Sequence, residues 1–206
     1  MKIAIFGTVG AGKSSISKEL SERLNFEIFP EPIDENPYFE DYYRDIKNYA
    51  FRMQIFMLTA RSKQLFTAKD LKNIIFDRSI IEDPIFMDVC HKLGNVNDTD
   101  YKTYCDFFQY VVSENLKYPN DRLKFDLVVY LKVSTETSIR RINERGRSAE
   151  LSIENEYWKI LNESYERYYQ AHKNDFPFLV IDANNDNLEE KVEEVIAAIK
   201  NNKKEF

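Results

Sequence analysis

The chain has 206 residues, 43% of them hydrophobic and 31% charged, so it can bury one core and stay in solution. Its 29 Lys and Arg against 35 Asp and Glu give a formal net charge of −6, which argues against nucleic acid as its main partner. The longest apolar runs are about five residues, whereas a membrane-spanning helix needs about 20, so we expect no membrane partner.

Strand patterns alternate with helix patterns along the whole chain. In chain order, the predicted elements are strand 2–6, helix 13–24, strand 26–29, a short helix and loop over 35–44, helix 48–69, strand 73–76, helices 83–91 and 98–117, strand 125–133, helices 135–145 and 152–172, strand 178–181 and helix 187–201. This alternation is typical of an α/β protein with a parallel sheet and helices on both faces. Such sheets bind ligands beyond the carboxyl ends of their strands.

Glycine is scarce except at one place. Only 5 of the 206 residues are Gly, and Gly7, Gly10 and Gly12 lie close together after the first strand. The segment from Gly7 to Ser14 matches the phosphate-binding pattern Gly-x4-Gly-Lys-Ser/Thr, in its required place between a strand and a helix. Such a loop lets backbone N–H groups reach phosphate oxygens, helped by the N-terminal end of the following helix.

We therefore expect a nucleoside triphosphate to bind this loop. The residues concerned are Gly7, Thr8, Val9, Gly10, Ala11, Gly12, Lys13, Ser14 and Ser15. The Lys13 ammonium would reach the β- and γ-phosphates, and the Ser14 hydroxyl would bind Mg²⁺. The loop alone leaves the reaction open. A nucleotide-switch protein is disfavoured, because the sequence lacks the Asn-Lys-x-Asp run that reads guanine.

A carboxylate follows the second predicted strand. Glu31 lies between Pro30 and Pro32, whose rings restrict the backbone and remove hydrogen-bond donors. At the functional edge of the sheet, this carboxylate could accept a proton from a substrate hydroxyl group. Taken alone, however, such a residue is more often a solvated loop glutamate.

Further motifs follow in a defined order. After the phosphate loop and Glu31 come Tyr43, Gln54 to Arg61, Asp77-Arg78-Ser79 with Asp83, and Arg141-x3-Arg145-Gly146-Arg147-x2-Glu150. As a set, from residue 2 to about 187, these motifs resemble the deoxyribonucleoside kinase family. The segment 31–37, Glu-Pro-Ile-Asp-Glu-Asn-Pro, looks most like the bacterial deoxyadenosine/deoxyguanosine kinases.

The resemblance implies a P-loop kinase with a five-stranded parallel sheet, flanking helices and an arginine-rich lid. It also implies ATP-dependent 5′-phosphorylation of deoxyribonucleosides in nucleotide salvage, with ATP as donor and Mg²⁺ as metal. Deoxyadenosine is the expected substrate, and deoxyguanosine or deoxycytidine are further candidates. The alternative is a nucleoside monophosphate kinase of thymidylate type, which would need no proton acceptor beside a hydroxyl group.

The family also implies roles for the residues around the reacting hydroxyl. Glu31 would hold the 5′-hydroxyl and take its proton, and Arg78 would pair with the 5′-oxygen and the phosphoryl group. Asp77 would lie near Mg²⁺, and whether Glu31 or Asp77 is the formal proton acceptor stays open. Tyr43 and Glu150 would bind the 3′-hydroxyl of the sugar.

The base would be read by residues of two helices. Gln54 offers one donor and one acceptor group, and Arg61, seven positions further, lies on nearly the same helix face. By resemblance, Asp83 would bind Arg61 and the base edge, and Phe86 would stack on the base. Without the family, Gln54 is equally well an exposed helix residue and Phe86 a core residue.

The remaining arginines would form a lid over about residues 141–152. Arg141 and Arg145 share a helix face, and Arg147 follows after a glycine. Concentrated arginine supplies positive charge to a transferring phosphoryl group. Residues 182–187 would contact the adenine of the donor.

The setting and assembly are also predicted. One domain over residues 1–206, with no export signal and two cysteines without metal or redox spacing, indicates a cytoplasmic protein. The family implies a homodimer through two helices, here 48–69 and 98–117.

Overall fold

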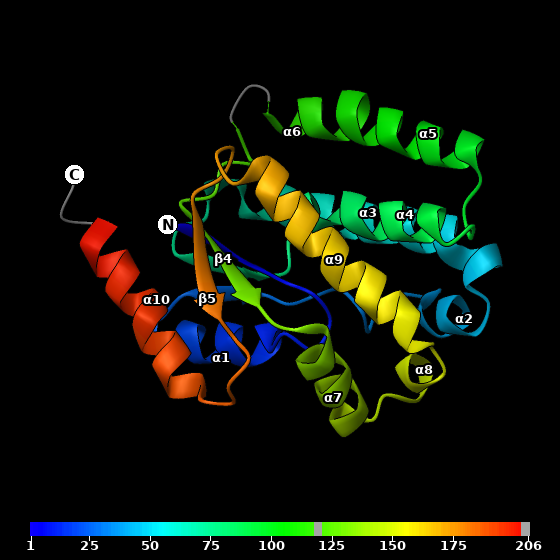
Figure 1. Ribbon diagram of the computed structural model, residues 1–206. Coiled ribbons are helices and arrows are strands. Elements are labelled where there is room, and N and C mark those ends of the chain that lie inside the picture. The colour runs from blue at the N-terminus through cyan, green and yellow to red at the C-terminus, as the bar shows by residue number, and fades with distance from the viewer. Residues whose placement is uncertain (118–120, 203–206) are drawn as a thin grey trace.

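The computed structural model describes residues 1–117 and 121–202 of the chain. In this part of the molecule, five strands form one parallel sheet with the order β2-β3-β1-β4-β5 (Figure 1). The strands are β1 (Lys2–Phe6), β2 (Glu27–Phe29), β3 (Ile74–Asp77), β4 (Leu127–Lys132) and β5 (Phe178–Asp182). The predicted five-stranded parallel sheet is therefore confirmed. The single domain predicted over 1–206 includes 118–120 and 203–206, which lie outside the described residues.

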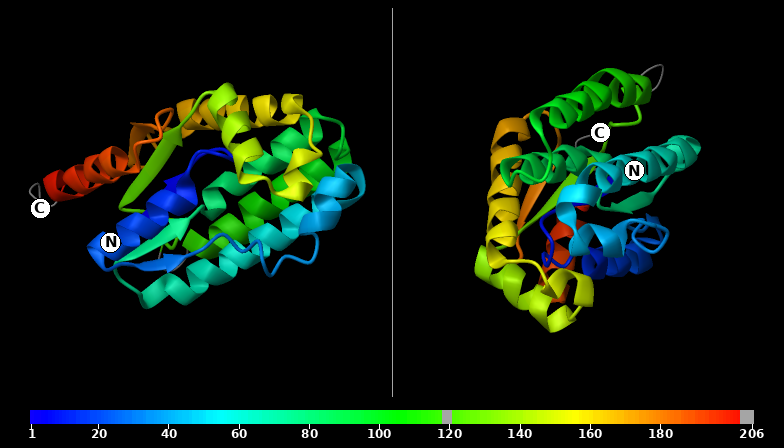
Figure 2. Two further views of the ribbon diagram at one scale, coloured as in Figure 1. Left: turned by 90° about the horizontal axis from the view of Figure 1, so that it is seen from below. Right: turned by 90° about the vertical axis from the view of Figure 1, so that its right-hand side faces the viewer.

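Helices cover both faces of the sheet. They are α1 (Lys13–Leu24), α2 (Phe39–Arg44), α3 (Ile46–Thr67), α4 (Asp83–Lys92), α5 (Asp98–Asp106), α6 (Glu114–Lys117), α7 (Thr135–Arg145), α8 (Ser148–Leu151), α9 (Asn155–His172) and α10 (Leu188–Asn202). Helices α1 and α10 pack on one face, and α3, α4 and α9 lie over the other (Figures 1 and 2). Across 1–117 and 121–202, no helix has the length and hydrophobicity of a membrane span.

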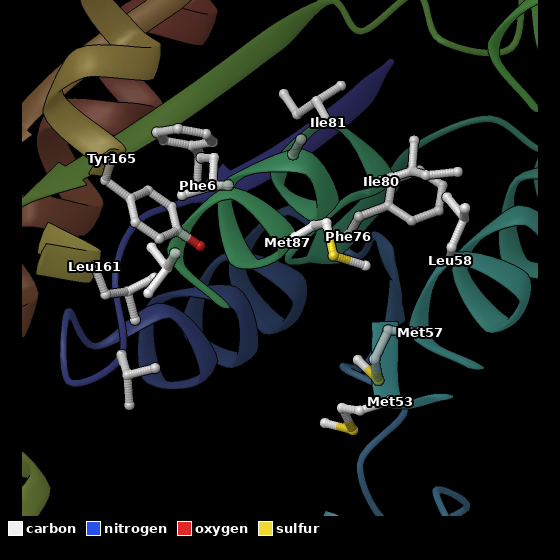
Figure 3. Close-up of a cluster of buried hydrophobic side chains, with 14 of the residues drawn as sticks. Phe6, Met53, Met57, Leu58, Phe76, Ile80, Ile81, Met87, Leu161 and Tyr165 are labelled. Carbon is white, nitrogen blue, oxygen red and sulfur yellow. The ribbon is translucent and has the colours of Figure 1, made fainter. Parts of the chain in front are cut away.

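Each face of the sheet has its own hydrophobic core. Along β1, Ile3 and Ile5 point to the α1–α10 side, whereas Phe6 points to the α3–α9 side. Successive side chains of a strand alternate between faces, so a sheet covered on both sides needs continuously apolar strands. Figure 3 shows the core on the α3–α9 side, where Phe6 lies beside Tyr165 of α9.

Two predicted elements differ from the observed ones by more than two residues. The predicted helix 98–117 contains a π-helical stretch over Phe107–Ser113. The predicted helix 152–172 begins only at Asn155, because Glu154 has extended backbone angles and precedes α9. The short helix and loop predicted over 35–44 are confirmed, with the helix over Phe39–Arg44.

The loop between β1 and α1 packs directly against α7. Gly10 has a φ of +78°, and a Cβ atom added there would lie 2.6 Å from the carbonyl oxygen of Ser138. The Ser138 hydroxyl in turn donates a hydrogen bond of 2.7 Å to the carbonyl oxygen of Val9. The predicted phosphate loop is therefore supported by a helix more than 120 residues away in sequence.

We predict that Gly10→Ala destabilises the fold much more than Gly94→Ala. Both residues have left-handed backbone angles, but no described atom lies within 4 Å of the Cβ position at Gly94. Left-handed strain should cost roughly 1 kcal/mol at Gly94, and the added clash should raise the cost at Gly10 to about 3 kcal/mol. Denaturant unfolding measures both values. Equal losses would show that α7 does not press on the loop.

Candidate active site

A cavity of about 620 Å³ opens at the carboxyl ends of β1, β2 and β3. It is lined by residues that the sequence singled out, from the phosphate loop, Glu31, Tyr43, α3, the end of β3, α4 and the segment 141–150. Four of the predicted site residues do not line it: Gly7, Thr8, Ala11 and Asp83. The structure thus brings together residues from seven separate parts of the chain, as expected at this edge of a parallel sheet.

The phosphate loop leaves backbone donors available. Gly12 precedes α1 with a φ of 91° and makes no side-chain cap, so the first N–H groups of the helix have no such partner. Lys13 is buried and its ammonium donates to the carbonyl oxygen of Thr8 at 2.7 Å. Burial, and then the charge of Arg78, lower the pKa of Lys13 to about 7. An anion in the loop would relieve both effects.

Glu31 lies between two buried guanidinium groups. Its Oε1 is 2.7 Å from Nε of Arg78 and 3.2 Å from Nη2 of Arg61. Burial alone would raise the pKa of Glu31, but the charges of Arg78 and Arg61 outweigh it and lower the pKa below its usual value. The carboxylate therefore stays ionised near neutral pH and can accept a hydrogen bond.

Asp77 and Ser14 provide oxygen atoms beside the phosphate loop. Asp77 ends β3 and is 4% exposed, and it lines the cavity together with Ser14. Burial raises the pKa of Asp77, although Ser14 and Lys13 oppose the shift. The Asp77 Oδ1 atom is buried without a hydrogen-bond partner. An unpaired carboxylate oxygen next to a hydroxyl group fits Mg²⁺, which takes few protein ligands and completes its shell with phosphates and water.

The rest of the described chain offers no richer metal site. Among residues 1–117 and 121–202, no group of three or more His, Cys, Asp and Glu side chains could hold a metal ion. The two histidines pair with single aspartates instead, His91 with Asp98 and His172 with Asp175.

The inner end of the cavity combines a buried amide with apolar walls. Gln54 is 3% exposed, and no hydrogen bond joins its amide to another described residue. Met53 and Met57 of the same helix, which Figure 3 labels, and Phe86 of α4 line the same cavity. A buried amide without a partner is costly, so its place on the cavity wall favours a polar ligand group there.

Arg61 is fixed beside Gln54 by two carboxylates. It is bonded to Asp83, which is 0% exposed, and to Glu31. The expectation that Gln54 and Arg61 share one face of α3 is confirmed, since both line the same cavity. Phe86 packs under the guanidinium group of Arg78, 5.0 Å from its ring centroid.

The segment after α7 is held by Glu150, which is 2% exposed. Its carboxylate oxygens lie 2.5 Å from Nη2 of Arg145 and 3.4 Å from Nη1 of Arg147. Burial, and then the charges of Glu150 and Glu31, raise the pKa of Tyr43. Tyr43 and Glu150 both line the cavity.

Arg141 joins the phosphate loop to the predicted adenine-contacting segment. Its Nη1 lies 3.4 Å from the carbonyl oxygen of Gly10, and its Nη2 donates to the carbonyl oxygen of Asn185 and to Asp186, both at 2.8 Å. In this conformation the three predicted lid arginines all have acidic partners on the protein.

Sequence reasoning missed Glu82 and Tyr42. Glu82 is 0% exposed and bonds Arg78 and Tyr165. Tyr42 lines the cavity and its hydroxyl lies 2.8 Å from that of Tyr157. The spacing of Glu82, four positions after Arg78, is the one signal that could have indicated the first pair.

Comparisons with known proteins agree on one family. The model of the deoxynucleoside kinase family matches residues 3–203. The chain is 36% identical to the deoxyadenosine/deoxycytidine kinase of Bacillus subtilis over 81% of this chain and 75% of that one. It is 32% identical to a deoxyguanosine kinase of Lactobacillus johnsonii over 96% and 92% of the two chains.

A solved structure is more similar still. The chain is 57% identical to a deoxyadenosine kinase from M. mycoides with bound dATP, over 97% of this chain and all of that chain. The two structures superpose with a TM-score of 0.89. The same kinase has also been solved with bound dCTP, with a TM-score of 0.88 to this chain.

We predict that Glu31 makes stability depend on pH in the acid range. Because its native pKa is lowered from 4.5, its ion pairs stabilise the fold above that pH and are lost as the pH falls through the native pKa. Replacing it by Gln should cost about 3 kcal/mol near pH 7, and the difference should shrink below about pH 4.5. Denaturant unfolding across this range measures it.

Glu27→Gln is the control, since Glu27 is an exposed carboxylate at the start of β2. A difference between the wild type and Glu31→Gln that is the same at every pH would contradict this prediction.

Proposed function

The chain belongs to the deoxynucleoside kinase family, and we propose that it transfers the γ-phosphoryl group of ATP to the 5′-hydroxyl group of deoxyadenosine. It is a deoxynucleoside kinase, so it converts a deoxynucleoside to the 5′-monophosphate. The position of Glu31 is the main observation that supports this cavity as the active site. Its carboxylate is bonded to Arg78 and lines the same cavity as the phosphate loop. An ionised acceptor and a cation thus stand beside the place for a donor phosphate.

In the proposed mechanism, Glu31 orients the acceptor. The 5′-hydroxyl donates a hydrogen bond to the Glu31 carboxylate, which takes the proton as the 5′-oxygen bonds to the γ-phosphorus and the bond from that phosphorus to the leaving ADP breaks. The lowered pKa of Glu31 keeps it ionised before the reaction. Asp77 faces Ser14 and Lys13 instead. We therefore assign proton acceptance to Glu31 and the metal to Asp77.

The donor side supplies positive charge. Phosphoryl transfer spreads negative charge over the equatorial oxygens, so well-placed cations carry most of the catalysis. Lys13 and Arg78 are positioned by the fold, and Arg141 and Arg145 would join them from the lid segment. Ser14 and Asp77 would hold Mg²⁺, which would supply further positive charge to the donor phosphates.

We also propose that the segment over about residues 141–152 acts as a lid. Closure of the segment over about residues 141–152 would exclude water from the reaction. The side chains of Arg145 and Arg147 are 37% and 43% exposed, which supports a segment that exchanges partners easily.

The sugar and base would bind deeper in the cavity. Tyr43 and Glu150 would hold the 3′-hydroxyl and leave no room for a ribose 2′-hydroxyl. The Gln54 amide would pair with the adenine edge and Phe86 would stack on the ring. The preference for deoxyadenosine is supported by three relatives more than 30% identical to this chain that are deoxyadenosine kinases, from Dictyostelium discoideum, Lactobacillus acidophilus and M. mycoides.

Assembly and setting complete the proposal. We infer a homodimer through α3 and the segment from α5 to α6. Large hydrophobic side chains are exposed on these elements, Phe66 on one and Tyr110 on the other, at 49% and 71%. A reducing cytoplasm is in keeping with the free thiols of Cys90 and Cys105.

We predict that purified protein with Mg²⁺ and ATP gives ADP fastest with deoxyadenosine. The panel is deoxyadenosine, deoxyguanosine, deoxycytidine, thymidine and deoxyadenosine monophosphate, compared by kcat/KM. The monophosphate should not react, because the acceptor site offers a carboxylate at Glu31. Turnover of the monophosphate alone would favour the thymidylate-type alternative, and no turnover with any nucleoside would overturn the assignment.

We predict that Glu31→Gln lowers kcat by about 10²- to 10⁴-fold, the usual contribution of a positioned proton acceptor. Affinity for an ATP analogue, measured by calorimetry, should be retained, since Glu31 makes no contact with the phosphate loop among the hydrogen bonds of the described residues. Glu35→Gln is the matched control, because Glu35 is an exposed carboxylate of the same segment. Wild-type turnover in Glu31→Gln would exclude Glu31 as the acceptor.

A further inference from the structure

Glu82 is a buried carboxylate to which the reaction assigns no part. It ends the short 3-10 helix before α4 and is 0% exposed. A buried carboxylate is costly unless its oxygens are paired. Its Oε2 accepts hydrogen bonds from Nη1 of Arg78 at 2.9 Å and from the Tyr165 hydroxyl at 2.5 Å. Its Oε1 accepts from the backbone N–H of Ser79 at 3.3 Å.

These contacts hold Arg78 from the side away from Glu31. The guanidinium group forms an ion pair with Glu31 through Nε, and it donates hydrogen bonds from Nη1 to Glu82 and to the Tyr165 hydroxyl. With only one carboxylate present, an arginine tends to bind it through two parallel N–H groups. Glu82 accepts from Nη1 and leaves Nη2 unused. Among the described residues, no hydrogen bond joins Nη2 to another group.

Glu82 also touches the start of the phosphate loop. Its Oε2 lies 3.5 Å from the backbone nitrogen of Gly7, and Nη1 of Arg78 lies 3.4 Å from the Gly7 carbonyl oxygen. The same carboxylate therefore contacts both the guanidinium group beside the acceptor and the first residue of the loop for the donor.

We infer that Glu82 is a positioning residue for phosphoryl transfer, which holds Arg78 in register between the acceptor and the phosphate loop and keeps Nη2 free for the transferring group. Tyr165 takes part in the same hydrogen-bond network, since its hydroxyl accepts from Arg78 and donates to Glu82. This inference rests on the proposed function, because it concerns Arg78 acting on the phosphoryl group. Without Glu82, the guanidinium group would turn toward Glu31 and withdraw Nη2 from the reacting atoms.

The first test is Glu82→Gln, assayed with deoxyadenosine and ATP. We expect kcat to fall by about 10- to 100-fold, the usual effect of removing a group that orients an active-site residue. KM for deoxyadenosine should stay nearly unchanged, because Arg78 acts on the transition state. Tyr165→Phe, which leaves the carboxylate and its ion pair with Arg78 in place, should lower kcat less, by about 5-fold.

The chain offers a matched control. Glu166 accepts from the Tyr130 hydroxyl at 3.3 Å and pairs with Lys132 at 3.1 Å, which is the same set of groups outside the cavity. Glu166→Gln and Tyr130→Phe should leave kcat unchanged. Thermal unfolding of each variant identifies the assay temperatures at which it is folded.

The decisive measurement is the effect of Glu82→Gln in an Arg78→Lys background. If Glu82 acts through Arg78, the double variant should be no slower than Arg78→Lys alone, since residues that act as a unit are not additive. If Glu82→Gln does not fold, Tyr165→Phe in the same background gives the comparison. The inference would be overturned if Glu82→Gln lowered kcat equally in the wild type and in the Arg78→Lys background. It would also be overturned if Glu82→Gln raised KM at normal kcat, or left kcat at the wild-type value. Failure of the proposed function is distinct, because the wild type itself would then be inactive.

Discussion

Arg78 is the group on which the arrangement of the site depends. Its side chain is 3% exposed and lies between the carboxylates of Glu31 and Glu82. A buried guanidinium group is stable only with such partners, and each partner in turn needs a positive neighbour. Arg61 meets that need for Glu31 and is itself paired with Asp83. Buried acidic and basic side chains therefore alternate through the site, and each one is held in place by the oppositely charged side chains on either side of it.

The parallel sheet makes this chain of charges possible. In the pairing of β1 with β3, Ile5 lies opposite Asp77, and the backbone N–H of Arg78 donates to the Ile5 carbonyl oxygen at 3.2 Å. Arg78 has a φ of 73°, a left-handed conformation that costs energy for a residue with a side chain. The ion pairs on both sides offset this cost and turn the side chain into the cavity rather than along the sheet.

Those parts of the site that depend on short motifs were predictable, and those that depend on packing were not. The phosphate loop, Glu31 and the Asp77-Arg78 pair follow strand ends, where polar residues interrupt apolar runs. Glu82 follows no such boundary, and its partner Tyr165 stands 83 residues later in a tyrosine-rich helix. The strand pattern predicted a parallel sheet, but the strand order came only from the structure, because alternating strands and helices are compatible with several orders.

Four of the five arginines that line the cavity fall into two groups by burial, and the two groups suit different tasks. Arg61 and Arg78 are 3% exposed, so breaking their ion pairs would leave charges in a medium that cannot solvate them. They are therefore fixed before any ligand arrives, which suits groups that must face the reacting atoms without rearrangement. Arg145 and Arg147 pair with Glu150 while 37% and 43% exposed. Ion pairs that water can reach contribute little, so phosphate oxygens can replace Glu150 at small cost. In the proposed mechanism the buried arginines set the geometry, and the exposed ones follow the donor into the site.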